Sequence, residues 1–260
     1  MVQQKNLRNR VSFVQFADTA NGSSFNQATY YSYDIHGNVD TLLQDYGVTS
    51  QYPNLMNKNG NRFKKVVYNY DLISGKVNKV SYQPGWSDQM YHKYSYDAEN
   101  RLTGVYTSFD GREWEREAKY EYYHHGPLAR TELGGQMVQG IDYAYTVQGW
   151  LKGVNSTMLL PTTDMGGDGL AAGINQLTAR DAVGFTLNYY DTADYAAISA
   201  LNPFPGVMAF MPDPAEYRPL FNGNISSMAV YNRALTTPAH AGSPLIPLRP
   251  AQQADANGFI

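Results

Sequence analysis

Short segments in which aromatic and polar positions alternate recur through residues 30–155 of the chain. In five of them an aromatic residue, any residue and a tyrosine are followed by a short gap, then Gly or Asn, any residue and an aliphatic. A period of two places both rings of such a pair on one face of a strand. The second tyrosines of these units are Tyr33, Tyr70, Tyr96, Tyr122 and Tyr145.

The residues after each tyrosine pair predict a tight turn. An aspartate at the end of a strand can accept backbone N–H bonds and start the turn, and three units carry one: Asp34, Asp71 and Asp97. A Gly or Asn that follows suits the positive φ of a tight hairpin, and these residues are Gly37, Gly75, Asn100, Gly126 and Gly149. An aliphatic such as Leu102 then begins the returning strand, so each unit is predicted to be a β-hairpin.

Consecutive hairpins define the predicted fold class. A lone hairpin is marginally stable in water, whereas stacked units bury each other's faces. We therefore expect an all-β protein whose antiparallel hairpin repeats form a curved, spiralling sheet. Residues 112–117 carry charges of alternating sign that could cap a helix, but the flanking hairpins favour an exposed strand there.

The strength of this pattern divides the chain into four parts. Residues 1–29 form a weakly patterned lead-in, and residues 30–155 hold the repeat sheet. Residues 156–235 contain degenerate repeats joined by long loops rich in Gly and Pro, and residues 236–260 are expected to be a disordered tail.

Composition supports an all-β chain with strands that are partly exposed to water. The chain has 22 Tyr against 10 Phe and 3 Trp, and 23 Gly, and Tyr favours strands while keeping a polar tip. A net charge of −3 does not favour nucleic-acid binding. The absence of Cys excludes disulfides, zinc–cysteine sites and thiol nucleophiles. The sequence shows neither a signal peptide at its start nor a run long enough to span a membrane.

Candidate chemistry is sparse. His124 and His125 are adjacent on a predicted strand and point to opposite faces, so they cannot share a metal ion. Residues 164–169 resemble a calcium loop, yet they lack the dense oxygen ligands and distal Glu of an EF-hand, and a plain Gly-rich loop explains them. Familiar nucleophile and phosphate-loop motifs are missing. The sequence therefore predicts no catalytic residue, no metal site and no cofactor.

The aromatic residues could also bind a ligand. Exposed rings can stack on sugars or on a partner's side chains, and the candidates for such contacts are Trp86, Trp114 and Trp150. Most of the rings are nevertheless expected to pack between strands.

The motifs resemble a known family. The segment Tyr96-Asp97-Ala98-Glu99-Asn100-Arg101-Leu102-Thr103 is similar to the signature of the Rhs/YD-repeat proteins, and residues 33–39 are a second match. Residues 126–130 and 148–155 also resemble Rhs proteins of Bacteroidetes-type bacteria. The resemblance implies a segment of a large exported or surface-associated bacterial protein, whose YD repeats wind into a hollow β-shell that holds a C-terminal toxin domain in some members.

The resemblance sets the functional hypotheses. We expect a structural segment of such a shell, without catalysis of its own, within a secreted or cell-surface protein. Its partners would be the remaining repeats of the same polypeptide, and also an encapsulated toxin domain or a surface glycan, with no nucleic acid and no membrane span. The alternative is a module that binds carbohydrate or a protein partner through its aromatic residues. A glycan-active enzyme is a third reading, which no motif supports.

Overall fold

The structure is a computed structural model, and it describes residues 3–17, 25–47, 61–156, 159–160, 162–190, 194–196, 203–204 and 219–233. These residues contain thirteen β-strands and no helix. They belong to two compact units, residues 1–117 and 118–260, which are described separately. The expected all-β fold is confirmed.

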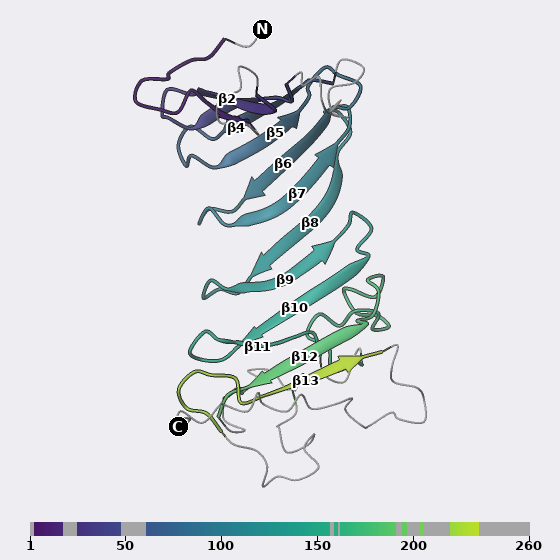
Figure 1. Ribbon diagram of the computed structural model, residues 1–260. Coiled ribbons are helices and arrows are strands. Elements are labelled where there is room, and N and C mark those ends of the chain that lie inside the picture. The colour runs from purple at the N-terminus through teal and green to yellow at the C-terminus, as the bar shows by residue number, and fades with distance from the viewer. Residues whose placement is uncertain are drawn as a thin grey trace, which may run out of the picture. The chain divides into compact units, whose positions relative to one another are not determined.

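The first unit is an antiparallel sheet in which each strand pairs with the next one in sequence (Figure 1). Its strands are β1 Phe13–Phe16, β2 Gln27–Tyr33, β3 Val39–Asp45, β4 Phe63–Tyr70, β5 Val77–Tyr82, β6 Met90–Tyr96 and β7 Leu102–Ser108. Most of its strand residues are half-buried, as expected of strands that are partly exposed to water.

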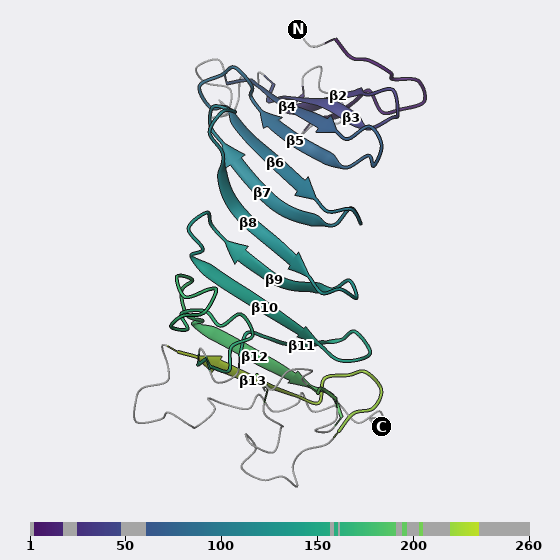
Figure 2. The ribbon, with the colours of Figure 1, turned by 180° about the vertical axis from the view of Figure 1, so that it is seen from behind.

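The second unit continues the same pattern of sequential antiparallel pairs (Figure 2). It contains most of β8 Glu115–Tyr122, followed by β9 Leu128–Leu133, β10 Gln139–Tyr145, β11 Leu151–Val154, β12 Val183–Asn188 and β13 Ser227–Asn232. The segment between β11 and β12 folds back beside the ends of β10 and β12 (Figure 1). The expected exposed strand near residue 115 is therefore present as β8, with Glu115 and Glu117 exposed.

The five sequence repeats are also a geometric repeat. In each hairpin the register shifts by one residue immediately before the second tyrosine, which then lies opposite the aliphatic residue that begins the returning strand. These pairs are Tyr33 with Val39, Tyr70 with Val77, Tyr96 with Leu102, Tyr122 with Leu128, and Tyr145 with Leu151. Each turn has a positive φ at the predicted Gly or Asn, including a φ of 62° at Asn100. The prediction of consecutive β-hairpins is confirmed.

Beyond residue 156 the described residues form two further strands, β12 and β13, which are not joined by a tight hairpin turn. The degenerate repeat around Tyr189 supplies β12, and the next strand, β13, pairs with it only after a long connection. None of the described residues forms a helix of the length and apolar character needed to cross a membrane. The predicted tail, residues 236–260, lies outside the described residues.

The interior of the second unit is mostly polar. Its buried apolar cluster is small and consists of Leu159, Ala229 and Tyr231. Charged side chains are also buried in this unit, among them Arg130, Asp142 and Lys152. Because buried charges are costly unless they are paired, the contacts of these residues matter most for this unit.

Candidate functional site

The repeat aspartates hold the hairpin turns through their side chains. Asp34 Oδ1 accepts hydrogen bonds from the backbone N–H groups of His36, Gly37 and Asn38, at 2.7–2.9 Å. Asp71 Oδ1 accepts the N–H groups of Ile73 and Ser74 at 3.1 and 2.7 Å. Each carboxylate thereby accepts hydrogen bonds from backbone N–H groups of the turn that have no partner on a neighbouring strand.

The third repeat aspartate adds an ion pair to the same arrangement. Asp97 Oδ1 accepts the N–H groups of Glu99 and Arg101, and Arg101 Nε donates to Asp97 Oδ2 at 2.7 Å. Desolvation raises the pKa of Asp97, but the hydrogen bonds and charge of Arg101 outweigh it and hold the pKa below its ordinary value. The motif residues Asp97, Asn100, Arg101 and Leu102 thus act within one hairpin.

The lowered pKa values predict how acid affects the first unit. Hydrogen bonds also hold the pKa of Asp71 below its ordinary value, chiefly that from the Ser74 N–H. A carboxyl whose pKa is lower in the folded state contributes stability above its unfolded pKa, and this stability is lost as the pH falls through the folded pKa. We expect the β4–β5 and β6–β7 turns to open below about pH 4. Hydrogen exchange of these turns across a pH series tests this, and turns equally protected at pH 3 and pH 6, after correction for intrinsic rates, would contradict it.

Tyrosine hydroxyls join three of the repeat units to the preceding one. Tyr70 Oη donates to the carbonyl oxygen of Val39 at 3.0 Å, and Tyr96 Oη donates to that of Val77 at 2.9 Å. Both acceptors are the aliphatic residue that begins the returning strand of the previous unit. Tyr189 repeats the contact with the Leu151 carbonyl oxygen at 2.8 Å. The degenerate repeat therefore keeps this inter-repeat bond, which phenylalanine could not make.

The inter-repeat bond gives a matched pair of variants. Replacing Tyr96 with Phe should lower the free energy of unfolding by about 0.5–1.5 kcal/mol, because it removes one hydrogen bond and leaves the Val77 carbonyl without its partner. Tyr94 lies on the same strand, and its hydroxyl makes no hydrogen bond to another described residue, so Tyr94→Phe should change little. Denaturant titration of both variants measures the difference, and equal losses would contradict the role assigned to Tyr96.

The three candidate tryptophans have different surroundings. Trp86 is 60 % exposed and lines a hollow of about 790 Å³ on the first unit, together with Tyr30, Leu43 and Phe63. Trp114 is half-buried, and the Lys93 Nζ lies 4.5 Å from its ring centroid.

Trp150, in the second unit, is half-buried and packs on Tyr189 with ring centroids 5.0 Å apart. Trp86 is therefore the most exposed of the three tryptophans.

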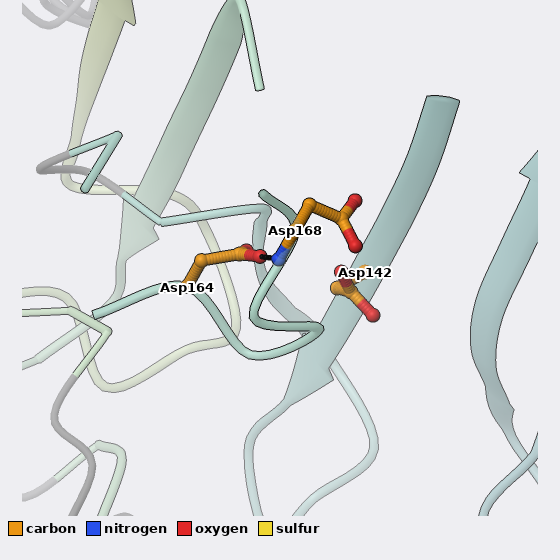
Figure 3. Close-up of side chains that lie close together, drawn as sticks. All are labelled: Asp142, Asp164 and Asp168. Carbon is orange, nitrogen blue, oxygen red and sulfur yellow. Dashed lines mark hydrogen bonds between the residues drawn. The ribbon is translucent and has the colours of Figure 1, made fainter. Parts of the chain in front are cut away.

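The second unit contains a buried set of four carboxylates, which we call the Asp cluster; its members are Asp142, Asp164, Asp168 and Asp181. Arg130 on β9 is the counter-charge. It donates from Nη1 to Asp142 Oδ2 at 2.6 Å and from Nη2 to Asp168 Oδ1 at 2.5 Å. Asp142 belongs to β10, whereas Asp164 and Asp168 come from the segment after β11 (Figure 3).

The loop that carries two of these aspartates is fixed by its own hydrogen bonds. Asp164 Oδ2 accepts the backbone N–H of Asp168 at 2.8 Å (Figure 3). A Cβ atom at Gly166 would collide with the Arg130 guanidinium and with Asp142 Oδ2, and one at Gly140 would meet Arg130 and Asp168 Oδ2. Glycine at these two positions lets the backbone approach the charged groups closely.

Burial raises the pKa values of three members of the Asp cluster. Desolvation, opposed by Arg130, raises the pKa of Asp142 to about 6, and it also raises the pKa of Asp168. Asp181 has a pKa of about 8, first because of burial and then because it faces the charge of Asp164. One guanidinium therefore does not balance these four carboxylates.

A second buried ion pair lies in the same unit. Lys152 Nζ on β11 donates to Asp194 Oδ1 at 2.8 Å and to Asn188 Oδ1 at 2.9 Å. Desolvation lowers the pKa of Lys152, partly offset by the hydrogen bond and the charge of Asp194. This pair ties β11 to the end of β12 and to the segment that follows it.

The sequence did not predict either buried charge group. The composition of residues 164–169 indicates a plain Gly-rich loop. Arg130, Asp142 and Lys152 belong to repeats in which the alternation of residues alone predicts which face a side chain occupies. The one sequence feature that points to these buried charge groups is the presence of charged residues at inward strand positions. The partners lie too far apart in sequence for spacing to reveal them.

Among known proteins, this chain is similar to solved structures at low sequence identity. No family model matches the chain, and no curated protein matches it. The crystal structure of TcdB2-TccC3-Cdc42 is 17 % identical, with a TM-score of 0.40, and the match covers 50 % of this chain and 6 % of that one. The Tc holotoxin pore of Photorhabdus luminescens is 14 % identical, with a TM-score of 0.44, covering 64 % and 7 %. The chain thus spans less than a tenth of the length of either structure.

Proposed function

We propose that this chain is a structural segment of a larger Rhs-type bacterial protein, forming one stretch of a YD-repeat β-shell with no catalysis of its own. The observation that carries the proposal is the repeated inter-hairpin bond. Three tyrosine hydroxyls use the previous unit as their acceptor: Tyr70 on Val39, Tyr96 on Val77 and Tyr189 on Leu151. Such a unit needs a neighbour on each side, as in repeat proteins whose stability comes from nearest-neighbour contacts.

The outer strands support further repeats as partners. Among the described strands β1 pairs with β2 alone, and β13 pairs with β12 alone. β1 is exposed along its whole length and carries Phe13, Val14 and Phe16. An exposed apolar edge strand is prone to pair with another strand, which in this proposal is supplied by the rest of the same polypeptide. An encapsulated toxin domain and a secreted or cell-surface location follow from the resemblance to Rhs proteins.

The proposal can be tested on the protein made by its own host. An antibody raised against this chain should detect a polypeptide several times heavier than the 29.0 kDa of these residues. Electron microscopy of that polypeptide should show a hollow β-shell. A host polypeptide of about 29 kDa that is monomeric and monodisperse on size-exclusion chromatography would contradict the proposal.

A carbohydrate-binding surface is the second candidate, because Trp86 is exposed beside a hollow lined by other aromatic side chains. An exposed indole can stack on the apolar face of a sugar ring. A glycan array should then show binding that Trp86→Ala abolishes, whereas Phe109→Ala, an exposed aromatic outside the lining of this hollow, should retain it. An array without binding would remove this candidate.

A further inference from the structure

We propose that the Asp cluster of the second unit binds one calcium ion. The site goes beyond the structural function proposed above, and its existence does not depend on it. The site is supported by the spacing of the carboxylates, their missing hydrogen bonds, the charge balance and the access from solvent.

The carboxylates lie at distances that one ion can bridge. An oxygen from each of Asp142, Asp164 and Asp168 lies within 4.8 Å of the other two. Calcium binds oxygen at about 2.3–2.6 Å, so two ligands on opposite sides of the ion are about 4.6–5.2 Å apart. Small side-chain rotations would therefore bring all three oxygens to one ion.

Two members of the cluster lack hydrogen-bond donors. Asp181 is 3 % exposed and its carboxyl group faces that of Asp164; once Asp181 is ionised, neither of its oxygens accepts a hydrogen bond from the described residues. Asp164 Oδ1 is also buried without such a donor, although Oδ2 of the same side chain is bonded. Buried polar atoms nearly always have a partner, and leaving one unsatisfied is costly. A bound cation would supply the missing partner for both side chains.

The charge balance points to a cation as well. Arg130 engages one oxygen each of Asp142 and Asp168, and among the described residues it makes all the ion pairs to the Asp cluster. Glu132, also buried, lies 3.6 Å from Arg130 Nε and adds a further negative charge. Carboxylates repel one another strongly in a poorly solvated interior. A divalent ion would offset the excess negative charge that one guanidinium leaves.

The cluster can be reached from solvent. A pocket of about 560 Å³ borders it and is lined by Asp164, Gly166 and Gly167, with the acidic side chains of Glu121 and Glu132 also on its wall. An ion could therefore approach Asp164 through this pocket, whose wall also carries Lys119 paired with Glu121. The glycine residues of this wall leave space that a side chain would occupy.

The ligand set selects the type of ion. Carboxylate oxygens alone favour hard cations such as calcium and magnesium over zinc or copper, which prefer nitrogen and sulfur. Magnesium requires near-ideal octahedral geometry at about 2.0–2.1 Å and keeps several waters, whereas calcium accepts irregular arrangements of carboxylates. Two ligands on a Gly-rich loop and two on other segments form an irregular set, so the site suits calcium better.

Calorimetric titration of the chelator-treated chain with CaCl₂ is the first test. We expect one calcium ion per chain, with a dissociation constant between about 10⁻⁷ and 10⁻³ M, and weaker binding of magnesium. Calcium should also raise the melting temperature, since it binds only the folded site. Absence of both effects at millimolar calcium would overturn the proposal. So would a stability that rises on acidification and ignores calcium, because a shared proton would then neutralise the carboxylates.

Isosteric variants locate the site. Asp164→Asn and Asp181→Asn each remove one charge without changing side-chain size, and each should weaken calcium binding at least tenfold. Asp71→Asn makes the same change at a hairpin turn of the first unit and should leave binding unaltered. Affinities equal to that of the unmodified chain in both cluster variants would overturn the assignment.

A measurement on the unmodified chain guards against variants that fail to fold. Calcium should slow hydrogen exchange in β10 and in residues 162–182, which carry the four aspartates. Protection centred on the hairpin turns of the first unit would overturn the proposal.

Discussion

Replacing Arg130 with methionine is expected to lower the free energy of unfolding of the second unit by about 3–5 kcal/mol at pH 8 in calcium-free buffer. The methionine keeps much of the side-chain volume but leaves Asp142 and Asp168 buried without their counter-charge. Removing one partner of a buried ion pair costs more than the pair contributes, because the remaining charge has lost both solvent and partner. Hydrogen exchange of the β9 and β10 amides against denaturant measures the loss locally.

The loss in the Arg130 variant should depend on pH in a defined direction. Burial raises the pKa of Asp142 to about 6 even with Arg130 present, and removal of Arg130 raises it further. An acid whose pKa is higher in the folded state binds its proton there first, so its destabilising effect is absent at low pH and grows as the pH rises through the folded pKa. The variant should therefore approach the stability of the unmodified chain near pH 4.

Two control variants distinguish the loss of the buried Arg130 ion pairs from a general destabilisation of the second unit. Lys119 on β8 pairs with Glu121 at the surface. It also lies 3.8 Å from Glu132, which keeps Arg130 beside it when Lys119 is removed, so Lys119→Met should cost no more than about 1 kcal/mol. Combining Arg130→Met with Asp142→Asn and Asp168→Asn should recover part of the loss, because the two carboxylates that Arg130 binds then carry no charge. A loss in the single variant no larger than that of Lys119→Met would show that the buried pair has little energetic role.

Replacing Lys152 with methionine should cost a similar amount, about 3–5 kcal/mol, for a related reason. Asp194 would remain buried with one backbone bond, from the N–H of Tyr189 at 3.0 Å, and Asn188 Oδ1 would lose its donor. The end of β12 and the segment after it should open, which fluorescence of the nearby Trp150 can report through its contact with Tyr189.

The Lys152 prediction has its own control and its own contrary outcome. Asp194→Asn in the Lys152→Met background removes the uncompensated charge and should restore part of the stability. Lys119→Met again provides the surface comparison. A double variant less stable than Lys152→Met alone would show that Asp194 contributes through contacts other than this ion pair.

The hairpins could be predicted from the sequence because each one is determined locally. Asp34 bonds to groups two to four residues ahead of it, and Gly37 has the positive φ that the turn requires. Tyrosine at alternate positions placed the rings on one face, and the aliphatic residue after the turn defined the returning strand. None of these features depends on the arrangement of distant segments.

The acceptor of each tyrosine hydroxyl could be predicted only in part. The sequence indicates on which face of a strand each tyrosine ring lies, but it does not give the acceptor of the hydroxyl group. The Tyr70 hydroxyl donates to the carbonyl oxygen of Val39, 31 residues earlier in the chain. That partner depends on how consecutive hairpins stack, and the number of residues between repeats varies. The tryptophans illustrate the same limit, because similar local patterns left Trp86 exposed and Trp150 packed on Tyr189.

The sequence by itself determined the all-β class, the hairpin units and the residues of their turns, because these follow from backbone geometry within a few residues. Only the tertiary structure decided the buried charge groups. Arg130 meets Asp168 across 38 residues, and Lys152 meets Asp194 across 42. The first pair forms because the segment after β11 folds back beside β10, and the second because Asp194 follows β12, the strand that pairs with β11. Burial then turns ordinary surface-type residues into strongly interacting ones.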